Sequence, residues 1–112
     1  MYSRMPSPLG EFEQLVMCAV LRLDDDAYGA TIRRELLDRA ERDVSPGAIF
    51  TTLERLEARG LVTSTYGEPT HERGGRRKRY YRVRPEGRRA LAASLDTIRR
   101  MVRGLELGEK RS

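Results

Sequence analysis

The sequence predicts a mainly helical domain that carries one β-hairpin. Three observations support this fold class. Apolar residues recur every three or four positions in three stretches before residue 60. Two short segments after Gly60 alternate as strands do, and a loop of glycines and charged residues separates them. A last stripe of apolar residues at helical spacing follows Pro85.

The first two helices can be placed from their apolar spacing. The segment PLGEFEQLVMCAVLRL sets one stripe at helical spacing: Leu9, Phe12, Leu15, Val16, Ala19, Val20 and Leu23. A helix with two apolar faces usually contacts both its own core and a partner, and a second, weaker stripe comprises Gln14, Met17 and Leu21. After the polar turn Asp24–Asp26, a second helix is expected from Gly29 to Glu41, with an inner side of Ile32, Leu36, Leu37 and Ala40.

The third helix has the clearest boundaries. Ser45 is a favoured N-cap residue, Pro46 suits the first helical position and Gly60 is the expected stop. Its buried side is expected to comprise Ile49, Phe50, Leu53 and Leu56. The segments LVTSTYGE and RYYRVRP are then expected to pair as a hairpin. Pro85 can open a final helix with one narrow apolar stripe, which comprises Leu91, Leu95, Ile98, Val102 and Leu105.

This order of elements is that of a winged helix-turn-helix. A chain of 112 residues is expected to fold as one domain with a modest core. We assign residues 1–84 to the winged helix-turn-helix domain, with the wing at about residues 62–84. Residues 85–107 are assigned to a C-terminal dimerisation helix that belongs to the same compact unit.

Positive charge is concentrated in the second part of the chain. The net charge of +5 divides into −3 for residues 1–43 and +8 for residues 44–112. Such a patch is expected for a polyanionic partner, although a solvated basic face has the same composition. No apolar run approaches the roughly 20 residues that cross a bilayer, so no membrane association is expected. The single cysteine, Cys18, excludes an intramolecular disulfide and favours the reducing cytoplasm.

The outer side of the third helix is the first candidate contact to nucleic acid. It is expected to carry small residues, hydroxyls and guanidiniums, namely Ala48, Thr51, Thr52, Arg55 and Arg59. Small side chains let a helix sit deep in the major groove, where threonine and arginine can bond base edges. We expect DNA contacts from Ala48, Thr51, Thr52 and Arg55, and phosphate contacts at the helix start from Ser45 and Gly47. Taken alone, this side is more often an ordinary solvated surface.

The hairpin adds a second basic element close behind that helix. Its loop and second strand carry no acid between residues 73 and 85, but they carry Arg73, Arg76, Arg77, Lys78, Arg79, Arg82 and Arg84. Phosphate contacts from such a wing supply affinity and orientation, while the helix reads the sequence. We therefore expect contacts to the DNA backbone or minor groove from Arg76, Arg77, Lys78 and Arg79.

The segments SPGAIFTTLERLEARGLV and GGRRKRYYRVRPEGRRAL resemble the helix and wing of the PadR family of bacterial transcriptional regulators. AYGATIRREL also resembles that family's segment before the second helix, and the likeness covers roughly Leu9 to Leu105. The resemblance implies a homodimeric repressor that binds a palindromic operator in double-stranded DNA. It also implies a dimer interface of the first and last helices, which would include Gln14, Met17, Leu21, Leu91, Leu95, Ile98, Val102 and Leu105. Two departures are Phe50, where the family more often has tyrosine, and the short C-terminal helix of a compact branch.

Other residues that could carry chemistry have plainer explanations. His71 is the only histidine and Cys18 lies far from it in sequence, so no metal is expected. Asp24–Asp26 lacks the later carboxylate of a calcium loop. No catalytic set of residues is present, so neither an enzyme nor a cofactor is expected, and a small-molecule effector is left open. Two alternatives stay open: a winged-helix protein-interaction module, and an RNA or single-strand binder that stacks bases on Tyr80 and Tyr81.

Overall fold

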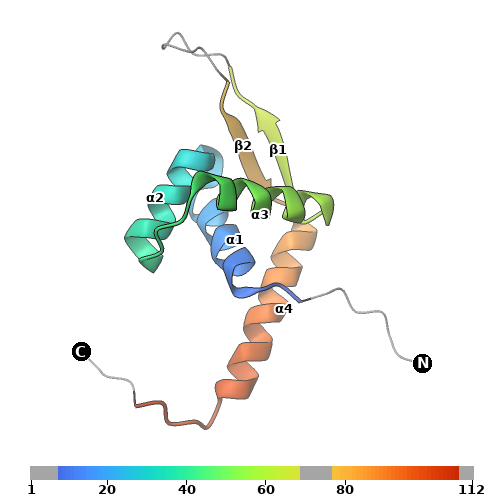
Figure 1. Ribbon diagram of the computed structural model, residues 1–112. Helices are drawn as coiled ribbons and strands as arrows, with labels where there is room; N and C mark the ends of the chain where they lie inside the picture. The colour runs from blue at the N-terminus through green and yellow to red at the C-terminus, as the bar shows by residue number, and fades with distance from the viewer. Residues whose placement is uncertain (1–7, 69–76, 109–112) are drawn as a thin grey trace.

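The computed structural model describes residues 8–68 and 77–108 (Figure 1). The fold is mainly helical with one two-stranded antiparallel hairpin, which confirms the predicted fold class. The elements are α1 (Glu11–Leu23), a 3-10 turn η1 (Asp24–Asp26), α2 (Gly29–Ala40), α3 (Pro46–Ala58), β1 (Val62–Tyr66), β2 (Arg79–Val83) and α4 (Pro85–Val102). None of the helices in the described ranges is long and apolar enough to cross a membrane.

The boundaries of α3 follow from its end residues, as the sequence predicts. The Ser45 hydroxyl oxygen accepts the Ala48 N–H at 3.1 Å, and Pro46 occupies the first turn, where its missing N–H is not needed. After the helix, Gly60 has a φ of 77°, in the left-handed region that glycine enters without steric cost. The chain can therefore turn sharply from α3 into the wing.

The wing is an antiparallel pair in which Val62 lies opposite Val83 and Tyr66 lies opposite Arg79. Tyr81 and Val83 are buried and Arg82 between them is exposed, so β2 alternates as the sequence predicts. The base of the wing is joined to the rest of the protein because the Tyr81 N–H donates to the Ala27 carbonyl at 2.9 Å. The turn after α1 thus lies alongside β2.

The core lies between the helices and the base of the wing. Its largest fully buried side chains come from α1, α2, α3 and β1: Met17, Ile32, Ile49, Leu53, Leu56, Val16, Val20 and Val62. The first turn of α4 packs very closely on this core. A Cβ atom at Gly87 would collide with the Leu61 carbonyl oxygen and would stand 2.9 Å from Val83 Cγ1 and 3.0 Å from Met17 Cε.

Three expectations about helix faces are wrong. On α2, Leu37 was expected on the inner side, but it is 46% exposed. On α3, Ile49, Leu53 and Leu56 are buried as predicted, but Phe50 is 51% exposed and Thr52 takes its place inside, at 4% exposure. Positions 49, 52, 53 and 56 share one side of a helix, and position 50 lies off that side. On α1, Met17 was expected to face a partner, yet it is fully buried beneath the start of α4.

The helix α4 begins at Pro85 as predicted and extends away from the body on the side opposite to the wing (Figure 1). Leu91 is buried in the protein's own core, so its predicted place in a dimer interface is wrong. From residue 96 onward every described residue is exposed, including Ile98, Met101 and Val102. The helix ends at Val102, and Leu105 lies beyond it rather than in the predicted helical stripe.

Candidate nucleic-acid interface

The exposed side of α3 has small and polar residues along its middle. Gly47, Thr51 and Arg55 lie four residues apart and therefore line up along one side of the helix, with Ala48 beside them. We call these four residues the α3 face. All four are exposed, and Arg55 forms no ion pair with another residue that the structure describes. Three of the predicted contacts, Ala48, Thr51 and Arg55, are thus placed together and open to a ligand.

The start of α3 offers two donors to an anion. The Ala48 N–H is taken by the Ser45 hydroxyl oxygen, and the Ile49 N–H donates to the Ser45 carbonyl at 3.2 Å. Since Pro46 has no N–H, the first turn presents the Gly47 N–H and the hydroxyl hydrogen of Ser45. Both residues are exposed, and the positive end of the helix dipole favours an anion there.

Two residues predicted on the outer side of α3 are turned away from it. Thr52 is buried among the core side chains, so its predicted role in DNA contact is wrong. Arg59 follows the helix, and its Nη1 atom lies 3.7 Å from Glu13 Oε1 of α1. The guanidinium of Arg59 therefore serves the contact between the end of α3 and α1.

The described part of the wing carries Arg77 and Lys78 at the entrance to β2. Arg77 is exposed. Lys78 is half-buried, with its Nζ atom 4.7 Å from the centre of the Tyr28 ring, so the ammonium group lies over an aromatic face. The Tyr28 ring also packs edge-on against Tyr80, with ring centres 5.4 Å apart. Arg76, which was predicted to contact DNA, lies outside the described residues, as does His71.

Arg79 does not occupy the position predicted for it. Its Nη1 atom lies 3.1 Å from Glu54 Oε2 and its Nη2 atom 3.0 Å from Glu57 Oε1, both on α3. Its Nε–H donates to the Ser64 hydroxyl at 3.0 Å. The guanidinium thus points from β2 toward α3, and not outward as expected for a side chain that runs along the DNA backbone.

The surroundings of Arg79 and Tyr81 also shift the pKa values of these two groups. Partial burial opposes the positive charge, but nearby Tyr81 and Glu54 raise the pKa of Arg79 overall, so the guanidinium stays charged. Burial raises the pKa of Tyr81 above its ordinary value, while the Arg79 cation opposes this shift. Tyr81 therefore remains a neutral phenol at neutral pH. Since Tyr81 is also buried, it is closed to the base stacking that a single-strand binder would use.

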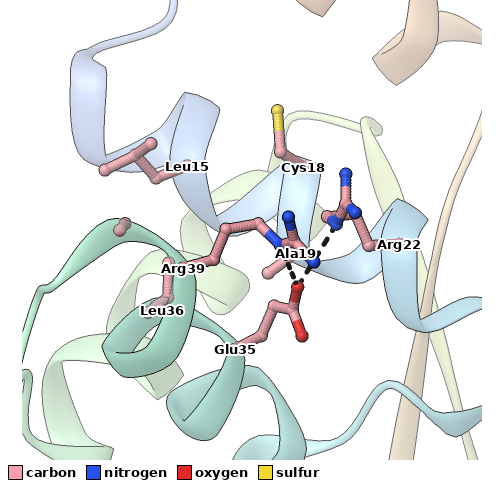
Figure 2. Close-up of a pocket in the computed structure, with 8 residues that line it drawn as sticks. Leu15, Cys18, Ala19, Arg22, Glu35, Leu36 and Arg39 are labelled. Atoms are coloured by element: carbon pink, nitrogen blue, oxygen red, sulfur yellow. Dashed lines mark hydrogen bonds and ion pairs between the residues drawn. The ribbon is translucent and has the colours of Figure 1, made fainter. Parts of the chain in front are cut away.

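A groove of about 310 Å³ lies between α1 and α2 (Figure 2). Its apolar lining includes Leu15 and Leu36, and Glu35 at its edge pairs with two arginines. Glu35 Oε2 lies 3.2 Å from Arg22 Nε and 2.9 Å from Arg39 Nε, as the dashed lines in Figure 2 show. With all three charges engaged in one network, the groove presents chiefly apolar surface.

Cys18 also lines this groove. Burial raises the pKa of the Cys18 thiol above its ordinary value, and the nearby Arg22 cation lowers it to a smaller extent. The thiol is therefore protonated at neutral pH, unlike a reactive cysteine, whose pKa is lowered. Among the residues that the structure describes, no group of three or more His, Cys, Asp or Glu side chains could hold a metal ion.

The residues predicted for a dimer interface fall into two groups. Met17 and Leu91 are buried in the core, while Leu21 and Leu95 are half-buried and pack against it. Gln14 is half-buried, and its Nε2 atom donates to the Leu9 carbonyl at 2.9 Å. The other group, at the exposed end of the chain, comprises Ile98, Val102 and Leu105.

One residue that positions the interface was missed in the sequence. The Nε–H of Arg33 on α2 donates to the Val44 carbonyl at 2.7 Å, and its Nη2 atom lies 3.3 Å from Asp43 Oδ1. Arg33 therefore fixes the turn between α2 and α3, which sets the direction of α3. The only sequence signal is a cation on α2 with an acid ten residues later, and many surface pairs share that pattern.

The comparisons with known proteins agree on one family. The sequence profile described as "Transcriptional regulator PadR-like family" matches residues 17–93. Transcriptional regulator Rv3488 of Mycobacterium tuberculosis (strain ATCC 25618 / H37Rv) is 38% identical over 80 residues, which cover 71% of this chain and 70% of that protein.

Solved structures show the same fold. A PadR family transcription regulator from Clostridium difficile R20291 matches with a TM-score of 0.69 and 26% identity, covering 82% of this chain and 91% of that one. A transcriptional regulator from Clostridium thermocellum matches with a TM-score of 0.68 and 22% identity, covering 80% of this chain and 84% of that one. The profile match extends from α1 through the wing into α4, so the chain belongs to the PadR-like family of winged-helix, DNA-binding transcriptional regulators.

Proposed function

We propose that this protein represses transcription by binding, as a homodimer, to a palindromic operator in double-stranded DNA. The observation that carries the DNA-binding part is the exposed α3 face, with anion donors at the start of the same helix. In this proposal Thr51 and Arg55 read base edges, Ala48 allows close approach, and Ser45 and Gly47 bind a phosphate. Arg77 and Lys78 follow the flanking backbone, together with Arg76. This function requires no catalytic step and no cofactor.

The proposed division of the chain follows the same roles. Residues 1–84 form the DNA-binding unit, and residues 85–107 contain the helix that brings two copies together. The support for a homodimer is the exposed part of α4, where Met101 is 72% exposed and Ile98 and Val102 lie beside it. Apolar side chains gathered on a helix that leaves the body are typical of an interface with another chain. Sedimentation measures this state directly, and a protein that stays monomeric at micromolar concentration contradicts the homodimer.

Variants at the two kinds of DNA contact are expected to affect DNA binding differently. The test measures binding to a duplex from the region upstream of the protein's own gene and to a scrambled duplex, over a series of salt concentrations. Arg55→Ala is expected to cost about 1–3 kcal/mol on the native duplex and to relax the preference for it. Arg77→Ala is expected to weaken binding to both duplexes equally. It should also reduce the salt slope, which is the change of log affinity with log salt concentration, by about 1.

The matched control is Arg100→Ala, which removes the same charge from α4, where Arg100 pairs with Asp96. It is expected to bind like the unaltered protein. Binding of the unaltered protein that is insensitive to salt and equal on both duplexes would contradict the proposal and favour a protein-interaction module. For repression, a reporter gene behind the bound duplex should fall in expression when the protein is supplied, and a rise would reverse the proposed sign.

A further inference from the structure

Arg79 of β2 contacts α3, β1 and three aromatic rings. Besides the two carboxylates on α3, it binds Ser64 of β1, whose hydroxyl also donates to the Glu57 carboxylate at 3.1 Å. Its guanidinium carbon lies 6.0 Å from the ring centre of Phe50, 5.8 Å from that of Tyr66 and 5.4 Å from that of Tyr81. The side chain is 26% exposed. One residue of β2 is thus bonded to both α3 and β1.

The negative charges of Glu54 and Glu57 would be unfavourable beside DNA, and the Arg79 cation can neutralise them. Glu54 is exposed on α3, next to the α3 face, and Glu57 is half-buried one turn further along. A carboxylate without a counter-ion near DNA would repel the phosphates, because like charges at close range cost free energy. Three of the five N–H directions of the Arg79 guanidinium are used on α3 and β1, which leaves a minor part of it for any outside partner.

We propose that Arg79 is a positioning residue, which holds the wing against α3 and neutralises Glu54 and Glu57 without contacting DNA itself. This inference rests on the proposed DNA-binding function and names how the two DNA-binding elements are kept together. A planar guanidinium suits this role because its fixed fork of donors can bond several acceptors at once. The ammonium group of a lysine offers no such fork, so Arg79→Lys is expected to restore only part of the effect.

The first test needs no DNA. The Gly67 N–H donates to the Lys78 carbonyl at 2.8 Å at the outer end of the described hairpin, so its hydrogen exchange reports on the hairpin. In Arg79→Met this amide is expected to exchange about tenfold faster or more, as local opening becomes easier. The matched control is Arg82→Met on the same strand, because Arg82 is exposed and its Nη1 atom lies 3.9 Å from Asp24 Oδ1. It should leave the exchange of Gly67 unchanged, and equal exchange in the two variants overturns the proposal.

The second test separates positioning from direct contact. Arg79→Met is expected to weaken duplex binding on the order of tenfold, because two carboxylates lose their counter-ion. Adding Glu54→Gln and Glu57→Gln to that variant removes the uncompensated charge and should recover most of the affinity. If Arg79 contacts a phosphate directly, the added substitutions should not recover the affinity, and Arg79→Met should lower the salt slope by about 1. That result would overturn the proposal. If the unaltered protein binds no duplex, the proposed function fails, and the exchange comparison alone decides the role of Arg79.

Discussion

Thr51 and Thr52 are adjacent and chemically identical, yet they lie in opposite environments. Thr51 is exposed on the α3 face, while Thr52 is buried with Ile49, Leu53 and Leu56. Only 4% of Thr52 is exposed, so its side chain belongs to the core and is closed to a ligand. One threonine is therefore available to a ligand, and the other contributes to the stability of the fold.

Alanine at these two positions should separate binding from stability. Thr52→Ala removes a buried methyl and hydroxyl and is expected to lower the free energy of unfolding by about 1–2 kcal/mol, with the DNA preference unchanged. Thr51→Ala is expected to change stability by less than about 0.5 kcal/mol and to alter the preference at one base pair. Urea unfolding and competition binding measure the two effects. Equal stability of both variants would contradict the assignment of Thr52 to the core.

Phe50 and Thr52 show where prediction from the sequence reaches its limit at single residues. Hydrophobicity ranks phenylalanine above threonine for burial, so the sequence favours Phe50 as the inner residue. The packing of α3 against α1 and α2 decides the rotation of the helix, and a small rotation exchanges Phe50 for Thr52. Arg79 shows the same limit. Alternation along β2 correctly places it on the side of Tyr81, but its partners Glu54 and Glu57 lie more than twenty residues away.

The elements themselves were predictable because their signals are local. Ser45, Pro46 and Gly60 determine where α3 begins and ends, and Pro85 begins α4. The hairpin follows from alternation and from the break between its strands. The end of α4 was less predictable, because an apolar residue at helical spacing, Leu105, continues past the point where the backbone leaves the helix. Gly104, with a φ of 87°, marks that end.

The junction of β2 and α4 depends on one glycine. Gly87→Ala would place a methyl group against the Leu61 carbonyl oxygen, a backbone atom that has little freedom to move. We expect it to cost about 3 kcal/mol or more, and to lower the melting temperature by about 10 °C or more.

Gly29→Ala is the matched control for Gly87→Ala. Gly29 begins α2, and a Cβ atom there meets nothing within 4 Å. Because alanine favours helix, this variant is expected to be as stable as the unaltered protein or more stable by about 0.5–1 kcal/mol. Thermal unfolding followed by circular dichroism measures both variants. A Gly87→Ala protein that melts with the control would contradict the close packing of α4 on the core.

At the scale of the whole molecule, the surfaces proposed for DNA binding and for dimerisation lie on opposite sides. The wing extends from one side of the body, and the exposed part of α4 extends from the other (Figure 1). A second copy bound through α4 would therefore leave both α3 faces and both wings open to DNA. Two recognition helices that enter successive major grooves are about 34 Å apart, one turn of the double helix. The proposed homodimer and the proposed palindromic operator are thus a single geometric hypothesis.

This hypothesis predicts that dimerisation and binding to a full operator are lost together. Ile98 is 55% exposed in the apolar stripe of α4, and Ile98→Glu places a charge there. The variant should sediment as a monomer. A linked pair of DNA-binding units gains about 10²–10⁴ in affinity on two half-sites over one. The unaltered protein should show that advantage for the palindrome over a single half-site, and Ile98→Glu should bind both DNAs with nearly equal affinity.

The control for this experiment is Ala93→Glu, which adds the same charge on the opposite side of α4, where Ala93 is exposed. It should remain a dimer and keep the advantage on the palindrome. Circular dichroism must show equal helix content in both variants, so that loss of fold is not mistaken for loss of the interface. An Ile98→Glu protein that is monomeric yet retains the full advantage would show that two copies meet on the DNA through another surface. The exposed stripe of α4 would then need a different partner.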